Sequence, residues 1–448
     1  MAMVVKNNMQ AKNTLNQLNR NEKALSKDLK KLSSGLRVNA ADDDASGYAI
    51  SERMDQQIRA LEQDNANTQN GSSLLKVAEG AMNSTVEILT TLKEKVINAA
   101  NDTNTDSDRA TIQKELNQAL DQIDDNANTT YNGKMLLDGS HNSEVLSPGT
   151  YTHLSNESMA NGTKSIDKLV NLKSRDGDKL GIFPGDTIVV TYVKNGVTYA
   201  GPTATVNGET KVGLTVTNAS RLSDLFQWAR SDFSIGGGTT DKSLIGKDQY
   251  GNNVYTADGG DAFTVQAKNP GLAGQISGLT INVQNSEGMV RKSTNRILNN
   301  FSETIRAQNP SEDNALTFQT GTKANQSIKA GFTDMRSVAL GLKGTDGTKL
   351  KITSQVMANA AINVLDNAIA KVLNQQTTVG ALQSRMDFTS ANIVTSAENT
   401  TSSMSVIRDA DMAKEMTSYT KNNVLTQASQ SMLAQANQNS SSVLSLLQ

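Results

Sequence analysis

Both ends of this 448-residue chain carry a seven-residue apolar repeat that its middle lacks. From residue 358 to residue 407, positions spaced alternately by four and three are mostly apolar, beginning with Ala358, Ile362 and Leu365. Similar repeats begin near residues 4 and 54, and all five prolines lie between residues 148 and 310. Such spacing keeps one stripe facing one partner, as in a coiled coil. We therefore predict long helical ends that pair with each other and enclose a different kind of middle.

The middle changes to a strand-like pattern. Residues 187–193 and 197–199 flank Lys194-Asn195-Gly196, Asn207-Gly208 marks a second turn, and 262–267 and 279–283 predict further strands. Residues 220–230 predict a short helix, and 316–321 with 327–331 one more hairpin. The predicted fold class is mainly α with an inserted β-rich domain, in which long paired N- and C-terminal coiled-coil helices form a rod. The inserted mixed or β domain, about 165–312, has its own aromatic supply in Phe226, Trp228, Phe233 and Phe263.

Several helix ends are marked locally. A first helix over 1–34 ends at Ser33-Ser34-Gly35, and Asp42-Asp43-Asp44 places carboxylates at the N-terminus of a second helix that runs to about residue 100. Ser107 or Asp108 is expected to cap a third helix, which ends before Tyr131-Asn132-Gly133. A discontinuity is expected around 408–411, before a final helix.

Composition narrows the function. Hydrophobic residues are 36% and aromatic residues 4%, a lean supply for globular cores, so long helices buried against neighbouring copies are favoured over partial disorder. The net charge is −2 without a basic tract, which argues against nucleic acid. We expect no signal-peptide core, no membrane insertion and no disulfide. Two histidines, His141 and His153, lack a metalloprotease pattern, and Gly236-Gly237-Gly238 lacks a phosphate-loop context, so we expect no catalytic residue, cofactor or metal.

Several blocks of residues match a known family. They include Ser33-Ser34-Gly35-Leu36-Arg37, Asp43-Asp44-Ala45-Ser46-Gly47, Arg408-Asp409-Ala410-Asp411-Met412-Ala413 and Leu433-Ala434-Gln435-Ala436-Asn437-Gln438. In this order, over about 1–140 and 316–448, they resemble bacterial flagellin, the subunit of the flagellar filament. The resemblance implies a structural subunit of an extracellular filament that serves swimming, exported unfolded by the flagellar type III apparatus without a cleaved signal.

The resemblance also implies a division into segments. Residues 1–42 and 409–448 would form the two halves of an inner-tube domain, and 43–164 and 313–408 the two parts of a helical rod. Residues 165–312 would form a variable, surface-exposed outer domain, open to glycosylation. Implied partners are further copies of the chain, filament-cap and hook–filament junction proteins, and an export chaperone at the C-terminal helix.

Two sets of residues are assigned from this reading. The inner-tube assembly stripe comprises Leu15, Leu18, Leu25, Leu29, Leu32, Val424, Ala428, Met432, Leu444 and Leu447. The second set aligns with the stretch that the animal Toll-like receptor for flagellin contacts in the flagellins it senses, and comprises Thr90, Thr91, Leu92, Lys93, Glu94, Lys95 and Glu115. Thr91 and Lys95 replace an arginine and a leucine of the family pattern, so we expect weakened receptor binding. The alternative for this face is packing against the next subunit.

Two other functions compete with this reading. A hook–filament junction protein shares the paired terminal helices, although the Ser-Ser-Gly-Leu-Arg block and the Leu-Ala-Gln-Ala-Asn end favour flagellin. An adhesin or enzyme carried by the outer domain would need a pocket with convergent polar groups.

Overall fold

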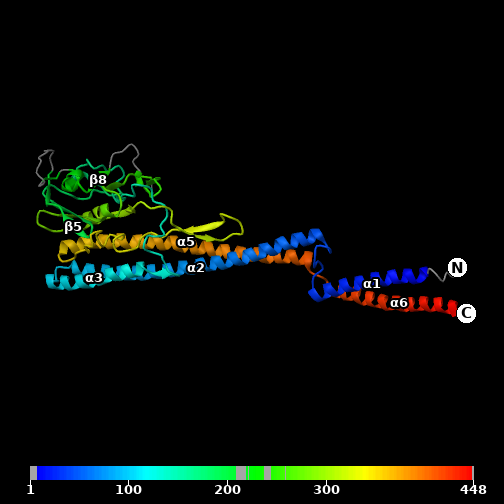
Figure 1. Ribbon diagram of the computed structural model, residues 1–448. Coiled ribbons are helices and arrows are strands. Elements are labelled where there is room, and N and C mark those ends of the chain that lie inside the picture. Colours follow the sequence, from blue (N-terminus) through cyan, green and yellow to red (C-terminus); the bar gives the residue numbers. More distant parts are fainter. Residues whose placement is uncertain (1–7, 208–217, 220, 237–243, 258, 446–448) are drawn as a thin grey trace. The chain divides into compact units, whose positions relative to one another are not determined.

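The computed structural model describes residues 8–207, 218–219, 221–236, 244–257 and 259–445 (Figure 1). Its helices are α1 (Met9–Ser34), α2 (Ala45–Ala99), α3 (Asp106–Ala127), α4 (Lys292–Leu298), α5 (Gln355–Arg408) and α6 (Met412–Ser445), with 3₁₀ helices at Leu169–Asn171, Leu222–Ala229 and Leu272–Gly274. Its strands are β1 (Thr130–Tyr131), β2 (Lys134–Met135), β3 (His153–Asn156), β4 (Thr187–Lys194), β5 (Val197–Ala200), β6 (Ala204–Val206), β7 (Asn218–Ala219), β8 (Phe233–Gly236), β9 (Leu244–Lys247), β10 (Asn253–Tyr255), β11 (Phe263–Ala267), β12 (Ile276–Gln284), β13 (Ser302–Ile305), β14 (Leu316–Gln319) and β15 (Ser327–Ala330). Helical ends around a β-rich middle confirm the predicted fold class.

Most helix ends lie where the capping and turn residues of the sequence predicted them. Gly35 adopts a left-handed conformation (φ 73°) and its N–H donates to the Lys31 carbonyl, which closes α1. The Asp44 carboxylate accepts from the N–H groups of Ser46 and Gly47 at the start of α2. The predicted break at 408–411 separates α5 from α6. The predicted start of the first helix, residues 1–7, lies outside the described residues.

The cap of α3 differs from the prediction. Thr105, rather than Ser107 or Asp108, is the cap residue, and Asp108 completes a capping box with it. The Thr105 N–H donates to the Asp108 carboxylate at 2.9 Å, and the Asp108 N–H donates to the Thr105 hydroxyl at 3.3 Å. Asp108 therefore stabilises this terminus from the third helical position.

The chain divides into two compact units. One comprises residues 1–69, 319–326 and 387–448, and the other comprises 70–318 and 327–386. Helices α2 and α5 run through both units. In the first unit, Leu61 and Ile393 are buried on the predicted heptad positions, and the Ser390 hydroxyl bonds the Asn65 side chain at 2.7 Å.

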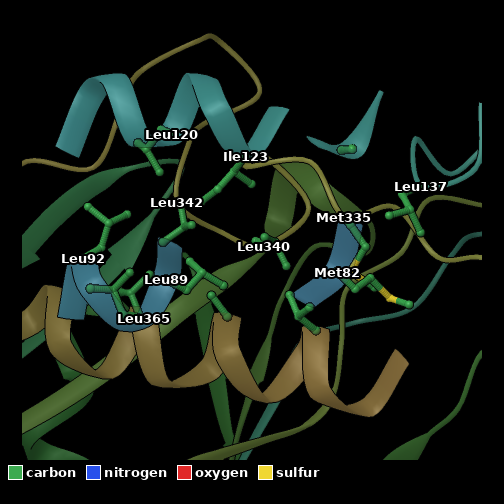
Figure 2. Packing of buried hydrophobic residues seen from close by; sticks show 14 of the residues in the cluster. Met82, Leu89, Leu92, Leu120, Ile123, Leu137, Met335, Leu340, Leu342 and Leu365 are labelled. Atoms are coloured by element: carbon green, nitrogen blue, oxygen red, sulfur yellow. The ribbon is translucent and has the colours of Figure 1, made fainter. Parts of the chain in front are cut away.

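In the second unit, the heptad stripes of α2 and α5 lie in one apolar core with α3. The stripe residues concerned are Leu75, Met82, Leu89 and Val96 of α2 and Ala358, Leu365, Val372, Val379 and Met386 of α5, all buried. Figure 2 shows Leu342 between Leu120 and Ile123 of α3 on one side and Leu89 and Leu365 on the other. The seven-residue repeat therefore marks the faces by which α2 and α5 pair, as predicted.

The β-rich region of the second unit contains two larger sheets and the β9–β10 hairpin. One has the strand order β13-β3-β11-β8, and the other has β12-β4-β6-β7 with β5 paired to β4. The predicted β4–β5 hairpin turns at Asn195 (φ 51°) and Gly196 (φ 71°), which suits an Asn-Gly pair. Strand β3 joins the first sheet although it precedes residue 165, where the sequence placed the start of the inserted domain.

The predicted aromatic core of this region is present. Phe226, Phe233 and Phe263 are buried together, and Trp228 is half-buried against them. The helix predicted for 220–230 is a 3₁₀ helix over Leu222–Ala229. The turn at Asn207-Gly208 and the Gly236-Gly237-Gly238 run extend into residues outside those described.

One expectation about membranes needs correction. Helix α5 contains an 18-residue window whose mean hydropathy, 1.2, would allow it to cross a membrane by length and composition alone. Half of that window is buried inside the protein. Its apolar character therefore serves the heptad core described above, as in a core helix.

Candidate assembly surface and buried polar sites

Helices α1 and α6 pair through a seam that is largely polar (Figure 1). The Asn21 side chain donates to the Leu425 carbonyl and to the Ser429 hydroxyl, at 3.3 and 2.9 Å. The Asn422 side chain donates to the Asp28 carboxylate at 2.6 Å. Asn21 and Asp28 are each more than nine-tenths buried. Because buried polar groups need these specific partners, the seam fixes the register of the pair.

Some residues of the predicted assembly stripe lie in this seam, and others are exposed to solvent. Leu18 is buried between the helices, and Leu25 and Leu32 are half-buried. Leu15 and Leu29 are 44% and 52% exposed, while Val424 and Met432 are 59% and 63% exposed, and Ala428 is exposed too. Leu447 and the side chain of Leu444 lie outside the described residues. The terminal pair therefore turns polar groups inward and many of its large apolar side chains outward.

Two shallow hollows in the first unit are also apolar. One lies on α6 over Met416, Thr420, Val424 and Leu425. The other lies between α2 and α5, where Ile58, Leu61 and Ile393 form the floor and Glu62 and Glu398 the rim.

The residues of the candidate receptor surface have different environments. Leu92 is 2% exposed and packs in the core, so it offers no contact surface in this structure, contrary to its inclusion in the predicted set. Thr91 is exposed, and its hydroxyl donates to the Glu87 carbonyl of its own helix. Thr90 and Glu94 are also exposed. Lys95 forms an ion pair with Glu115 at 3.2 Å, and Lys93 pairs with Asp366 at 2.5 Å.

Helix α5 carries a polar ladder that the sequence reasoning missed. Asn363, Asn367, Lys371 and Gln375 recur every four residues and so share one face. Asn363 and Asn367 donate to the Leu279 and Ser277 carbonyls of β12, at 3.0 and 2.9 Å. Gln375 donates to the Gly331 carbonyl. The spacing of four residues could have indicated a shared helix face. Polar residues at that spacing ordinarily face water, so nothing in the sequence indicated contact with a sheet.

At the third rung of this ladder lies a buried ion pair. Lys371 Nζ is 2.7 Å from the Glu303 carboxylate of β13, and the two side chains are 5% and 2% exposed. The Arg306 guanidinium lies near and donates to the Thr333 hydroxyl and the Asp334 carbonyl. Burial raises the pKa of Glu303 and lowers the pKa of Lys371, so each charge depends on the other. This pair connects β13 with α5.

The two histidines have different surroundings. His153 of β3 is 5% exposed and packs against Gly246, and burial lowers its pKa from 6.5 to about 4. The His141 ring contacts the Asn314 carbonyl. Within the described residues, no group of three or more His, Asp or Glu side chains is placed to hold a metal ion.

Comparison with protein families gives two matches. Residues 5–142 match the model of the bacterial flagellin N-terminal helical region, and residues 362–447 match that of the bacterial flagellin C-terminal helical region. A flagellin of Clostridium tyrobutyricum is 34% identical over 437 residues, which cover 97% of this chain and 99% of that protein. A flagellin of Bacillus subtilis (strain 168) is 30% identical, covering 99% of this chain and 100% of that one.

Solved structures give more distant likenesses. The hook-associated protein-3 of Legionella pneumophila matches 80% of this chain and 98% of its own, with 16% identity and a TM-score of 0.34. FliC of Burkholderia pseudomallei matches 70% of this chain and 99% of its own, with 17% identity and a TM-score of 0.27. These scores are too low to compare details, so we assign the family from the sequence relatives.

Proposed function

Because this chain belongs to the bacterial flagellin family and is a structural subunit of the flagellar filament, we propose that the exposed residues of α1 and α6 join its copies. The observation that carries this proposal is the division of the terminal pair into a polar seam and an apolar exterior. Leu15, Leu29, Val424 and Met432 are 44–63% exposed in the single chain. Burying the exposed part of each side chain between copies would gain about 1 kcal/mol.

We also propose a position in the filament for each segment of the chain. Residues 1–42 and 409–448 would line the inner tube, 43–164 and 313–408 would form the rod, and the β-rich region would face outwards. The sheet membership of β3 supports beginning that outer region near residue 153 rather than 165. Export in an unfolded state, binding of a chaperone to α6 and contacts with cap and junction proteins are further proposals from family membership.

The competing functions have less support. Flagellins match this chain over nearly its whole length at 34% and 30% identity, whereas the hook-associated and junction proteins are only 16% and 17% identical. Flagellin is a family of structural proteins, and we infer that this member has no enzymatic activity. A buried, neutral His153 supports that inference, because a general base needs access to a substrate.

Charge on the apolar exterior should block assembly. We expect the double substitution Leu15→Glu/Leu29→Glu to raise the protein concentration needed for polymerisation at least roughly thirtyfold, since the two lost leucine contacts together cost about 2 kcal/mol. The monomer should keep its helicity, because both positions are exposed. Electron microscopy and sedimentation under polymerising conditions measure the effect.

The matched control is Gln227→Glu, which adds a carboxylate to an exposed polar position of the β-rich region, outside α1 and α6. It should polymerise close to the parent concentration. Ordinary filaments from the double variant would show that the exterior of α1 is not an assembly surface.

Receptor recognition should improve when the family residues are restored. We propose that Thr91→Arg/Lys95→Leu raises activation of the Toll-like receptor for flagellin about thirtyfold, because a buried interface arginine contributes about 2 kcal/mol or more. Lys95→Leu would also free the Glu115 carboxylate, which Lys95 now holds at 3.2 Å. Reporter-cell activation by purified monomer tests this.

The single variants separate the two contributions. Lys95→Leu alone should give a small gain, and Thr91→Arg alone should give most of the effect. If the parent already signals as strongly as the double variant, the proposed anchor residues do not govern recognition of this flagellin.

A further inference from the structure

Strand β12 forms one edge of its sheet, because β4 is its one neighbour among the described strands. Its nine residues, Ile-Ser-Gly-Leu-Thr-Ile-Asn-Val-Gln, include no charged residue and no proline. Edge strands are ordinarily protected by charge, by proline or by shortness, because their free N–H and C=O groups pair readily with another chain. The composition of β12 offers none of these protections and is typical of segments that pair with copies of themselves.

Two helices, rather than a strand, cover this edge, and each uses a pair of asparagines. Helix α5 covers the first half. The Asn363 side chain donates to the Leu279 carbonyl at 3.0 Å, and the Asn367 side chain donates to the Ser277 carbonyl at 2.9 Å. The first half of the edge therefore has its carbonyls satisfied by side chains of α5.

Helix α4 and its C-terminal cap cover the second half. The Asn295 side-chain oxygen accepts from the Val283 N–H at 2.8 Å, and the oxygen of the cap residue Asn299 accepts from the Ile281 N–H at 2.5 Å. Ile281 and Val283 are buried, so these two N–H groups depend on the asparagines in place of water.

The spacing of the asparagines matches the spacing of the groups that they bind. Four residues of a helix advance about 6 Å, and two residues of a strand advance about 6.7 Å. Asparagines four residues apart therefore meet every second residue of β12, and alternate residues of a strand direct their N–H and C=O groups to the same edge. The two asparagine pairs thus take the place of a neighbouring strand.

The half of the edge under α4 is the more weakly held. Helix α4 has seven residues, fewer than an isolated helix needs for stability, whereas α5 has 54. Its other contacts include the buried Leu298 side chain and the bond from the Thr294 hydroxyl to the Leu180 carbonyl, at 2.6 Å. Without the asparagines, two buried N–H groups would lack an acceptor, which favours any arrangement that supplies carbonyls to them.

We propose that Asn295 and Asn299 keep β12 from pairing with β12 of a second copy of this chain. A second copy is the matching partner, because two identical uncharged strands pair antiparallel about a two-fold axis, and each supplies carbonyls for the N–H groups of the other. The edge of β12 is thus a self-pairing surface that the single chain keeps closed. This inference goes beyond the proposed function, since it concerns the β-rich region rather than α1 and α6.

The test uses the full-length protein under conditions in which the parent stays monomeric. In dilute Asn295→Ala/Asn299→Ala, we expect the Ile281 and Val283 amides to exchange with deuterium at least roughly tenfold faster than in the parent. In concentrated solution, sedimentation should show dimers, and both amides should regain protection. Of the single variants, Asn295→Ala should accelerate exchange at Val283 and Asn299→Ala at Ile281, which tests the contacts even if the double variant unfolds.

A charge on the strand should reverse the pairing. Asn282→Lys added to the double variant should restore the monomer, because it places like charges on two paired strands, while both amides still exchange fast. The same charge at Gln227, which is exposed outside β12, should leave the dimer intact. The matched control, Asn252→Ala/Asn253→Ala, removes two exposed asparagines from the β-rich region and should stay monomeric.

Three outcomes would overturn the proposal. Unchanged exchange in the double variant would show that the asparagines do not close the edge. A double variant that stays monomeric while both amides exchange fast would refute the pairing. Dimers in which both amides remain unprotected would place the contact on another surface. Polymerisation of the parent, followed separately by electron microscopy, tests the proposed function and is independent of these outcomes.

Discussion

Glu303→Gln is expected to lower the free energy of unfolding by about 3–5 kcal/mol. The substitution removes the carboxylate that lies 2.7 Å from Lys371 Nζ, where both side chains are at least nineteen-twentieths buried. The Lys371 ammonium then remains buried without the carboxylate that pairs with it, and breaking a buried pair from one side has this cost. Urea unfolding of the monomer, followed by helical circular dichroism and Trp228 fluorescence, measures it.

Two further variants isolate the ion pair. Glu287→Gln removes an exposed carboxylate from the same region and should change stability by no more than about 0.5 kcal/mol. Glu303→Gln/Lys371→Met removes both charges of the pair and should recover part of the loss. A Glu303→Gln protein as stable as the parent would mean that the ladder on α5 does not depend on this pair.

The pairing of α2 with α5 could be predicted because its signal is local and repeated. Every predicted heptad position from Ala358 to Ile407 is buried or half-buried, including polar Gln376, Gln383 and Ser390. Gln383 reaches Glu79 and Ser390 reaches Asn65, so the polar interruptions of the stripe are matched across the pair. The seven-residue period identifies the buried face of a helix even where a polar residue occupies one of its positions.

The ladder on α5 could not be predicted in the same way. Glu303 and Lys371 are far apart in sequence, and each would ordinarily be assigned to a solvated face. Only the tertiary fold brings β13 against α5 and makes the carboxylate a partner of the ammonium. The short helix α4 and the early strand β3 were missed for a related reason, because segments of four to seven residues carry little periodicity.

The terminal helices show where an apolar stripe misleads. In α1 the buried residues are Leu18, Asn21 and Asp28, so two of the three are polar, while Leu15 and Leu29 face out. The predicted stripe shares only alternate positions with the seam toward α6. In a subunit that assembles with further copies, some apolar residues pack within the chain and others pack against the next copy. A single sequence does not show which apolar residues belong to which contact.

Acid should destabilise the β-rich region through His153. Burial lowers the pKa of this histidine from 6.5 to about 4, so between those values the unfolded chain binds a proton that the folded chain does not. Stability therefore falls as the pH decreases from about 6.5 to 4, by about 3 kcal/mol in all, and the histidine adds no further loss below pH 4. Trp228, the single tryptophan, lies against the aromatic core of this region and reports its unfolding by fluorescence.

The decisive comparison is between variants, because carboxylates also titrate in acid. His153→Gln removes the ionisable group and should flatten the dependence of the unfolding free energy on pH between 6.5 and 5, where few carboxylates contribute. His141→Gln should leave that dependence unchanged, since the proton deficit belongs to the buried ring of His153. The chain has only these two histidines, so a slope that survives in His153→Gln would assign the acid sensitivity to other groups and refute the argument from burial.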